Sequence, residues 1–247
     1  MSVIGVGHML ANKKLIIFDL DGTLIDSIGV WNKVDETVIS MIRRDGGEGV
    51  ENVQKQRDEA LSRYRTFDNP YLEYYRFLKE KYNALESAEE ISEKRKALAQ
   101  KMIEEEVDYK PYAPEVIKAL HEKGYTLAIA STTRKMNMAI YKSVNQNIIS
   151  KAPFDQYFSV IYTHEDAKNI KPDPEILNRL ISEFEVLPTD CLVFEDSLVG
   201  AMAAKNAGIP VCVVYDKHSD GDREKLNSIA DYVINDFSEI LDMIKKG

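Results

Sequence analysis

Two aspartates one residue apart, Asp19 and Asp21, are the first side chains in this sequence whose types and spacing could support chemistry. They come directly after residues 15–18, an apolar run typical of a strand buried on both faces, and they open an Asp-Leu-Asp-Gly-Thr turn. Open α/β sheets place their ligands at the carboxyl ends of strands, and neighbouring carboxylates repel each other unless a proton or cation intervenes. The pattern therefore predicts a site for a hard divalent cation, Mg²⁺.

These two carboxylates also suit phosphoryl chemistry. One aspartate can attack phosphorus and form an aspartyl-phosphate, which splits one slow hydrolysis into two easier steps. The other can protonate the leaving oxygen and later deprotonate the attacking water. A solvated Asp-x-Asp-Gly turn would show the same pattern, so the catalytic interpretation requires further reactive side chains at the ends of the other strands.

Polar side chains stand at the ends of the next two predicted strands. Ser131 and Thr132 come after residues 125–130, where hydroxyls and free backbone N–H groups at a helix start suit a phosphoryl oxygen. Lys171 lies in an Asn-Ile-Lys-Pro-Asp-Pro loop after residues 158–162, and an ammonium fixed there could neutralise a nucleophile and a phosphate. The simpler alternatives are an ordinary N-cap for the hydroxyls and a solvated surface position for the lysine.

A second acidic pair, Glu195 and Asp196, comes after the apolar residues 191–194 and precedes a predicted helix. Carboxylates from two strand ends can converge on one cation, although acidic residues also favour helix starts through the helix dipole. Each signal is weak by itself, but all of them fall at carboxyl ends of predicted parallel strands and supply complementary groups. We therefore predict one active site made of Asp19, Asp21, Ser131, Lys171, Glu195 and Asp196.

The elements that must position these groups alternate between strands and helices after Tyr109. This alternation predicts a Rossmann-like α/β fold, a parallel sheet with helices on both faces. We expect strands at residues 125–130, 158–162, 191–194, 211–214 and 232–234, and helices at residues 116–124, 136–144, 176–184, 198–207 and 237–244.

Residues 30–108 differ in character, because they hold almost no β-branched run and their apolar residues recur at helical spacing. Asn69-Pro70 is typical of a helix start, and the Gly-rich residues 45–49 predict a loop. We therefore expect an α/β catalytic core made of residues 1–27 and 109–247, with an all-helical cap of three or four helices at residues 28–108. A cap inserted there would lie over the turn that carries Asp19.

Charge and composition restrict the partners. The 32 Lys+Arg and 41 Asp+Glu give a net charge of −9, so we expect no nucleic acid partner. No apolar stretch approaches the ~20 residues that span a bilayer, which predicts no membrane partner and a cytoplasmic protein. Residues 1–12 lack the positive start of a signal peptide and are expected to be a short flexible lead-in. We expect a monomer or weak homodimer. Cys191 and Cys212 are expected to be small residues of the hydrophobic core.

This set of residues resembles the motifs of the haloacid dehalogenase (HAD) superfamily, in its phosphatase and β-phosphoglucomutase-like branch: Asp19-x-Asp21-Gly22-Thr23, Ser131, Lys171-Pro172-x-Pro174 and Glu195-Asp196-Ser197. The resemblance covers residues 14–26 and 111–247, and the helical block is similar to the family's cap domain. It implies Asp19 as nucleophile, Asp21 as general acid and base, and Ser131 and Lys171 as the groups that hold the transferred phosphoryl. It also implies Mg²⁺ bound by Asp19, the backbone carbonyl of Asp21 and Asp196, with Glu195 helping directly or through water.

Position 31 bears on the reaction that the resemblance implies. The β-phosphoglucomutase-like mutases are expected to have a histidine near this position, whereas this sequence has Trp31. A tryptophan at this place resembles the sugar-phosphate phosphatases of the same branch, and Trp31 is a candidate for substrate contact. We therefore expect a Mg²⁺-dependent phosphomonoester hydrolase that acts on a small phosphorylated metabolite such as a sugar phosphate. The alternatives are a phosphosugar mutase, a regulatory domain that retains its phosphoaspartate, and a binding protein without catalytic activity.

Overall fold

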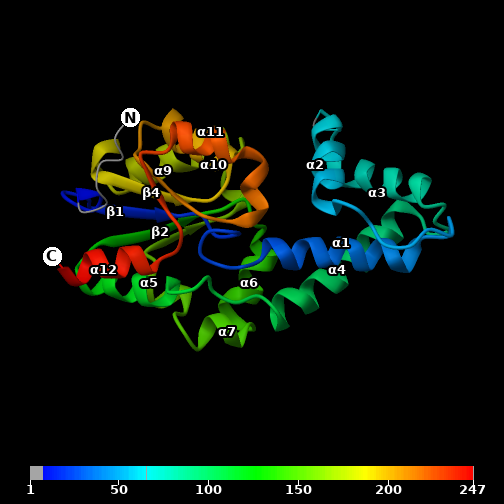
Figure 1. Ribbon diagram of the computed structural model, residues 1–247, viewed down its shortest axis with the longest axis horizontal. Coiled ribbons are helices and arrows are strands. Elements are labelled where there is room, and N and C mark those ends of the chain that lie inside the picture. Colours follow the sequence, from blue (N-terminus) through cyan, green and yellow to red (C-terminus); the bar gives the residue numbers. More distant parts are fainter. Residues whose placement is uncertain (1–7, 65, 247) are drawn as a thin grey trace. The chain divides into compact units, whose positions relative to one another are not determined.

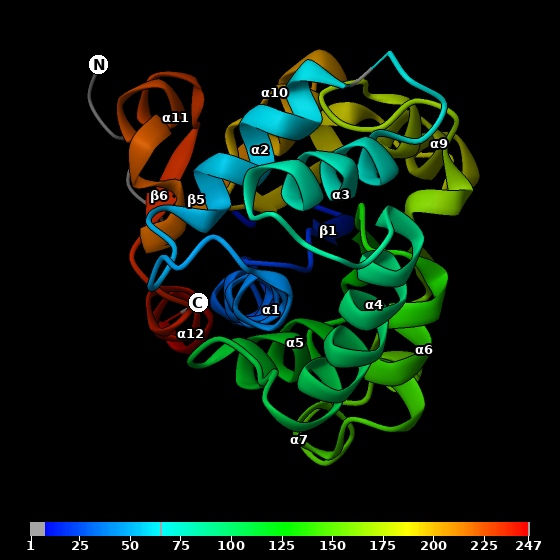
Figure 2. The same ribbon diagram turned by 90° about the vertical axis from the view of Figure 1, so that its right-hand side faces the viewer.

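The computed structural model describes residues 8–64 and 66–246, and the chain divides into two compact units. The first unit, the core, consists of Met1–Ser27 and Val107–Gly247 and contains the sheet. The second, the helical unit, is Ile28–Glu106, and its described residues form four helices. Figures 1 and 2 show both units.

The core is built on one sheet of six parallel strands in the order β3-β2-β1-β4-β5-β6. The first strand lies in the middle, because it pairs with β2 on one side and with β4 on the other. The bounds are β1 (Leu15–Phe18), β2 (Thr126–Ala130), β3 (Val160–Tyr162), β4 (Cys191–Glu195), β5 (Val211–Val214) and β6 (Tyr232–Ile234). The predicted Rossmann-like α/β class is confirmed.

Helices cover both faces of this sheet. Figure 1 shows α5 (Ala113–Glu122) and α12 (Ser238–Lys246) on one face, and α9 (Glu175–Glu183), α10 (Leu198–Asn206) and α11 (Arg223–Ile229) on the other. Three further helices stand between β2 and β3 in the sequence: α6 (Lys135–Ser143), α7 (Gln146–Ile149) and α8 (Phe154–Tyr157). The helices α7, α8 and α11 are not among those expected from the sequence.

The side chains of β1 show why this strand is apolar throughout. Leu15 and Ile17 belong to a buried cluster that includes Leu177 of α9. Phe18 points to the opposite face and stacks on Phe194 with ring centroids 4.9 Å apart. A strand buried on both faces is fixed by packing along its whole length, so the next residue along the chain is held in a defined place.

The helical unit has its own hydrophobic core. Its helices are α1 (Ile28–Ile42), α2 (Val53–Arg63), α3 (Pro70–Lys81) and α4 (Ala88–Glu105), with α1 packed on α4 and α2 packed on α3 (Figures 1 and 2). As Asn69-Pro70 predicts, α3 begins at Pro70, and the Asn69 side chain accepts a hydrogen bond from the Leu72 N–H at 3.2 Å. Tyr74 and Tyr75 are buried in this core, which explains the aromatic stripe of that helix.

Two local expectations need correction. The strand expected at residues 158–162 begins only at Val160, because the Phe158 N–H donates to the Phe154 carbonyl at 2.9 Å and so completes α8. Part of the lead-in over residues 1–12 is packed rather than flexible, since Met9 is fully buried and the Leu10 carbonyl accepts a hydrogen bond from the Tyr125 hydroxyl. Residues 1–7 of that lead-in lie outside the described residues.

The two cysteines, Cys191 and Cys212, are both buried and free, as expected. None of the helices within residues 8–64 and 66–246 combines the length and the apolar character that crossing a bilayer requires.

Candidate active site

Three buried acidic side chains meet at the carboxyl ends of β1 and β4. Asp19 comes directly after Phe18, Glu195 ends β4, and Asp196 is the next residue. The two strands pair in parallel with Phe18 opposite Phe194, and the Asp19 N–H donates to the Phe194 carbonyl at 2.9 Å. Carboxylate oxygens of the three residues consequently lie within 4.8 Å of one another.

Lys171 joins this cluster from the loop between β3 and α9. Its Nζ atom lies 2.6 Å from Asp19 Oδ1 and 2.7 Å from Glu195 Oε1, and its side chain is only 6% exposed. Burial by itself would lower the pKa of Lys171, but the two carboxylates outweigh burial and raise that pKa above its ordinary value. The ammonium is therefore charged and fixed beside both acids.

Three carboxylates surround the single ammonium of Lys171, so the site has room in its charge balance for a further cation. Burial raises the pKa of Asp19 well above its ordinary value, although the Lys171 ammonium opposes this effect. Burial, reinforced by the Glu195 carboxylate, raises the pKa of Asp196 to about 8. Because a hard divalent cation prefers oxygen ligands and stabilises ionised carboxylates, this buried cluster has the donor set to hold a metal ion.

The Glu195 carboxylate also holds the start of α10. Its Oε2 atom accepts hydrogen bonds from the N–H groups of Asp196 and Ser197, at 3.0 and 2.9 Å, and from the Ser197 hydroxyl at 2.9 Å. A Cβ atom on Gly200 would stand 1.6 Å from Glu195 Oε1, so only glycine leaves room for this carboxylate. Gly200 is thus part of the site, and Glu195 is placed to position Lys171.

Replacing Gly200 with alanine is expected to destabilise the protein by about 1–3 kcal/mol, because the new methyl group overlaps the Glu195 carboxylate. The displaced Glu195 should also shift Lys171, and a displacement of about 1 Å at a reacting group typically costs about 100-fold in rate. Urea denaturation and phosphate release would measure the two effects.

The matched control is Gly221→Ala, in the 3₁₀ helix η4 (Lys217–Asp222), where an added Cβ meets nothing within 4 Å. It should leave the rate of phosphate release within about twofold of the parent's rate, since it adds a methyl group in open space. Its free energy of unfolding should be nearly that of the parent for the same reason. If Gly200→Ala behaved like this control, the close contact between Gly200 and Glu195 would be wrong.

The Asp21 carboxylate stands outside the acidic cluster and has its own partners. Ser27 Oγ donates to its Oδ1 atom at 2.5 Å, and the Thr133 hydroxyl donates to its Oδ2 atom. The turn directly after Asp21 requires Gly22, because its φ of +84° lies in the left-handed region and an added Cβ would meet Asp196 Oδ2 at 2.5 Å. The two aspartates therefore have different surroundings, which suits two different chemical roles.

The hydroxyl-bearing loop after β2 divides its three side chains between the interior and the surface. Ser131 is buried, and its Oγ accepts a hydrogen bond from the Thr133 N–H at 3.0 Å. Thr132, a predicted substrate-binding residue, is exposed, whereas Thr133 is buried and reaches Asp21. Trp31 belongs to the helical unit, where the Arg95 guanidinium carbon lies 5.5 Å from its ring centroid.

Sequence reasoning missed several residues that complete this site. Thr23 donates from Oγ1 to Asp196 Oδ1 at 2.8 Å, and Ser27 and Thr133 hold Asp21. The Asp-x-Asp-Gly-Thr motif contains Thr23, so its hydroxyl was an available signal. Thr133 belongs to the same run of hydroxyl residues as Ser131 and Thr132, so its type was an available signal although its contact with Asp21 was not. Ser27 carried no signal, because hydroxyl residues in loops are common.

Comparisons with known proteins show the family to which these motifs belong. Residues 13–208 match the family model of the haloacid dehalogenase-like hydrolases. A phosphorylated carbohydrates phosphatase from Thermotoga maritima is 28% identical over 196 residues, which cover 79% of this chain and 82% of that protein. A phosphoglycolate phosphatase from Vibrio vulnificus is 28% identical over an alignment of 251 positions, which covers 94% of this chain and 96% of that protein.

Among solved structures, a proposed beta-phosphoglucomutase from Thermotoga maritima has a TM-score of 0.73 and 25% identity, and the match covers 94% of this chain and 99% of that one. These similarities confirm the expected superfamily, its phosphatase and β-phosphoglucomutase-like branch, and an enzyme of the phosphatase class. The chain belongs to the haloacid dehalogenase-like hydrolases.

Proposed function

We propose that this protein is a Mg²⁺-dependent phosphomonoester hydrolase that acts on a small phosphorylated metabolite through an aspartyl-phosphate. One observation carries the proposal: a buried aspartate at the end of the central strand lies 2.6 Å from a buried lysine and beside a further acid, Asp196. The relatives named for phosphorylated carbohydrates and phosphoglycolate support a small phosphorylated substrate.

The metal ion in this proposal is held by Asp19, the backbone carbonyl of Asp21 and Asp196. When bound, it neutralises charge on the phosphoryl oxygens. Glu195 has both carboxylate oxygens engaged by Lys171 and by the start of α10, so we assign it a positioning role that acts through Lys171.

The side chains of the core divide the chemistry between them. Asp19 attacks phosphorus, the bond from phosphorus to the ester oxygen breaks, and Asp21 gives its proton to the leaving alcohol. Asp21 then removes a proton from water, whose oxygen attacks phosphorus and releases inorganic phosphate and the Asp19 carboxylate. Lys171 neutralises charge on the transferred phosphoryl, and Ser131 and Thr132 hold its oxygens.

The partners of Asp21 fit its two tasks. A general acid and base must point at the same oxygen position in both steps, and the hydroxyls of Ser27 and Thr133 hold one carboxylate oxygen each. These bonds fix the rotation of the carboxyl group while it exchanges its proton.

We include in the proposal that the helical unit acts as the cap of the enzyme. A cap excludes bulk water while Asp19 attacks phosphorus, and it must open to admit the one water that the second step consumes. We favour hydrolysis over phosphosugar transfer because the indole of Trp31 has no proton that it can exchange near neutral pH, unlike the histidine expected in the mutases.

The test is a screen of phosphorylated metabolites against the purified full chain, with phosphate release measured in Mg²⁺, in excess EDTA and after Mg²⁺ is restored. We expect release from at least one ester, its loss in EDTA and its recovery with Mg²⁺. An isomerised sugar phosphate without phosphate release would establish a mutase instead. A long-lived phosphoprotein without turnover, or no reaction with any ester, would reject the proposal.

A further inference from the structure

The carboxylate of Asp196 accepts hydrogen bonds from two separate segments of the core. Thr23, in the turn after β1, is fully buried and donates from Oγ1 to Asp196 Oδ1 at 2.8 Å. Ser219 of η4 donates from Oγ to the other carboxylate oxygen, Oδ2, at 3.4 Å. The second contact is long for a hydroxyl bond, so its strength depends on how firmly η4 is held against Asp196.

A buried carboxylate, that of Asp216, organises η4. Asp216 is 2% exposed and stands directly before η4, where its Oδ1 atom accepts a hydrogen bond from the His218 N–H at 2.7 Å. The Asp216 carbonyl accepts from the Ser219 N–H at 3.1 Å and from Arg223 Nη2 at 3.0 Å. Because the backbone of Ser219 is bonded to Asp216, the place of the Ser219 hydroxyl depends on Asp216.

Lys110 holds the other oxygen of the Asp216 carboxylate. Its Nζ atom donates to Asp216 Oδ2, and the two side chains are 13% and 2% exposed. The Lys110 N–H donates to the carbonyl of Leu24 at 2.8 Å, and Leu24 is the residue after Thr23. A closed ring of contacts therefore joins the turn after β1, Lys110, Asp216, η4 and the Asp196 carboxylate, and all of its members belong to the core.

The ion pair in this ring has no part in the proposed chemistry. Burying an ion pair costs desolvation that the attraction between its charges often only offsets, so net stabilisation does not by itself explain such a pair. Burial is the main cause of the raised pKa of Asp196, to which the Asp216 carboxylate adds and which the Lys110 ammonium opposes. Since the two charges act on Asp196 in opposite directions, the main consequence of the pair is the fixed geometry of η4.

We propose that Asp216, held by Lys110, is a positioning residue that sets the orientation of the metal ligand Asp196 through Ser219. This inference deepens the proposed function and rests on it for the assignment of Asp196 as a metal ligand. Groups that orient a ligating carboxylate typically contribute about 10- to 100-fold to metal affinity. Asp216 acts on a ligand rather than on the nucleophile, so its loss should weaken binding of the cation and spare the chemical step.

The test measures the Kd of Mn²⁺ for the full chain by electron paramagnetic resonance, with the Kd of Mg²⁺ obtained by competition. In Asp216→Ala both Kd values should rise about 10- to 100-fold, because η4 loses its cap and Lys110 loses its partner. Asp216→Asn should recover part of the loss, since an asparagine side chain can still accept the His218 N–H. At saturating Mg²⁺, kcat for the best ester of the metabolite screen should stay within about threefold of the parent in both variants.

Ser219→Ala tests the same ring without disturbing the buried ion pair. It should raise the Kd of Mn²⁺ about 3- to 10-fold, a smaller effect because one long contact is lost. The matched control is Ser228→Ala in α11, which removes a hydroxyl that donates to the Lys225 carbonyl at 2.7 Å on the surface. Ser228→Ala should bind Mn²⁺ as the parent does.

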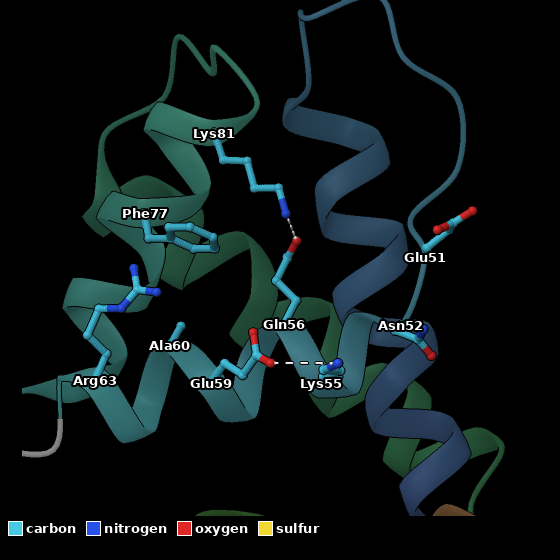
Figure 3. Close-up of a pocket in the computed structure, with 9 residues that line it drawn as sticks. All are labelled: Glu51, Asn52, Lys55, Gln56, Glu59, Ala60, Arg63, Phe77 and Lys81. Atoms are coloured by element: carbon cyan, nitrogen blue, oxygen red, sulfur yellow. Dashed lines mark hydrogen bonds and ion pairs between the residues drawn. The ribbon is translucent and has the colours of Figure 1, made fainter.

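Glu59→Ala is the control for Asp216→Ala, because it also removes a carboxylate that is paired with a lysine. Glu59 belongs to the helical unit and lines a hollow of about 200 Å³ between α2 and α3, where it pairs with Lys55 at 3.9 Å (Figure 3). Its side chain is 62% exposed, so solvent screens the pair. Glu59→Ala should leave the Kd of Mn²⁺ unchanged.

The outcomes separate this inference from the proposed function. An unchanged Kd in Ser219→Ala would overturn the inference whatever Asp216→Ala shows, because the route through Ser219 is part of it. Equal rises in the control variants, or a loss of kcat at saturating Mg²⁺ with an unchanged Kd in Asp216→Ala, would also overturn it. If the enzyme released no phosphate from any ester while Asp216→Ala and Ser219→Ala still weakened Mn²⁺ binding, the proposed function would fail and the positioning role would stand.

Discussion

Replacing Asp19 with asparagine is expected to lower the rate of phosphate release by about 10⁴-fold or more, because an amide cannot form the aspartyl-phosphate. The substitution preserves shape and keeps an acceptor oxygen beside Lys171, which contacts Asp19 Oδ1 at 2.6 Å. Two measurements check this expectation: kcat for the best ester of the metabolite screen, and acid-quench trapping of label from a ³²P-phosphorylated substrate. The parent should retain label on the protein and the asparagine variant should retain none.

Asp155→Asn is the matched control for this variant. Asp155 lies in α8 with its side chain 66% exposed and paired with Lys142, so the same chemical change occurs far from any buried charge. Its kcat should equal that of the parent. A rate in Asp19→Asn within about tenfold of the parent would assign the nucleophile to another residue, because loss of a nucleophile has effects orders of magnitude larger.

Replacing Lys171 with methionine is expected to reduce both stability and activity. Removing one partner of a buried ion pair typically costs about 3–5 kcal/mol, and here the loss leaves Asp19 and Glu195 as buried carboxylates without their shared cation. The rate should fall by about 10³-fold, because a fixed charge near the transferred phosphoryl is lost. Saturating Mg²⁺ should restore part of the stability but little of the rate, since a cation can compensate the carboxylates without replacing the ammonium. Urea denaturation with and without Mg²⁺, together with kcat, measures these effects.

Lys205→Met provides the comparison for this substitution. Lys205 pairs with Asp231 at 2.9 Å, but the two side chains are 41% and 36% exposed, so solvent screens the pair and its loss should cost about 0–1 kcal/mol. If Lys171→Met proved no more destabilising than Lys205→Met in the absence of Mg²⁺, the Lys171 ion pairs would not have the geometry described. If it retained the parent rate, Lys171 would have no role in phosphoryl transfer.

Much of the fold could be predicted because its causes are local in the sequence. The apolar run of β1 and the strand–helix alternation after Tyr109 result from burial and periodicity, which each segment carries by itself. The start of α3 at Pro70 results from the chemistry of one dipeptide. The short helices α7 and α8 escaped prediction because four residues are too few to show a helical period, and β3 was shortened by the helix that precedes it.

The candidate site was predictable only in part for the same physical reason. Residues at the carboxyl ends of parallel strands meet at one sheet edge, so chemical type and position were enough to bring Asp19, Lys171, Glu195 and Asp196 together. Which hydroxyl of the loop after β2 reaches Asp21 depends on the path of that loop. The structure has Thr133 rather than Thr132 bonded to Asp21, and no periodicity in the sequence encodes a difference of one residue.

The sequence by itself therefore determined the parallel α/β class and the presence of two acids, a hydroxyl, a lysine and a second acidic pair at four strand ends, because strand burial and turn chemistry are properties of short segments. Only the tertiary structure decided which of these groups touch. It engaged Glu195 with Lys171 and the start of α10, surrounded Asp21 with the hydroxyls of Ser27 and Thr133, and made Gly200 indispensable to the Glu195 carboxylate. Contacts between distant segments depend on how helices and loops pack around the sheet, and packing is a property of the whole fold.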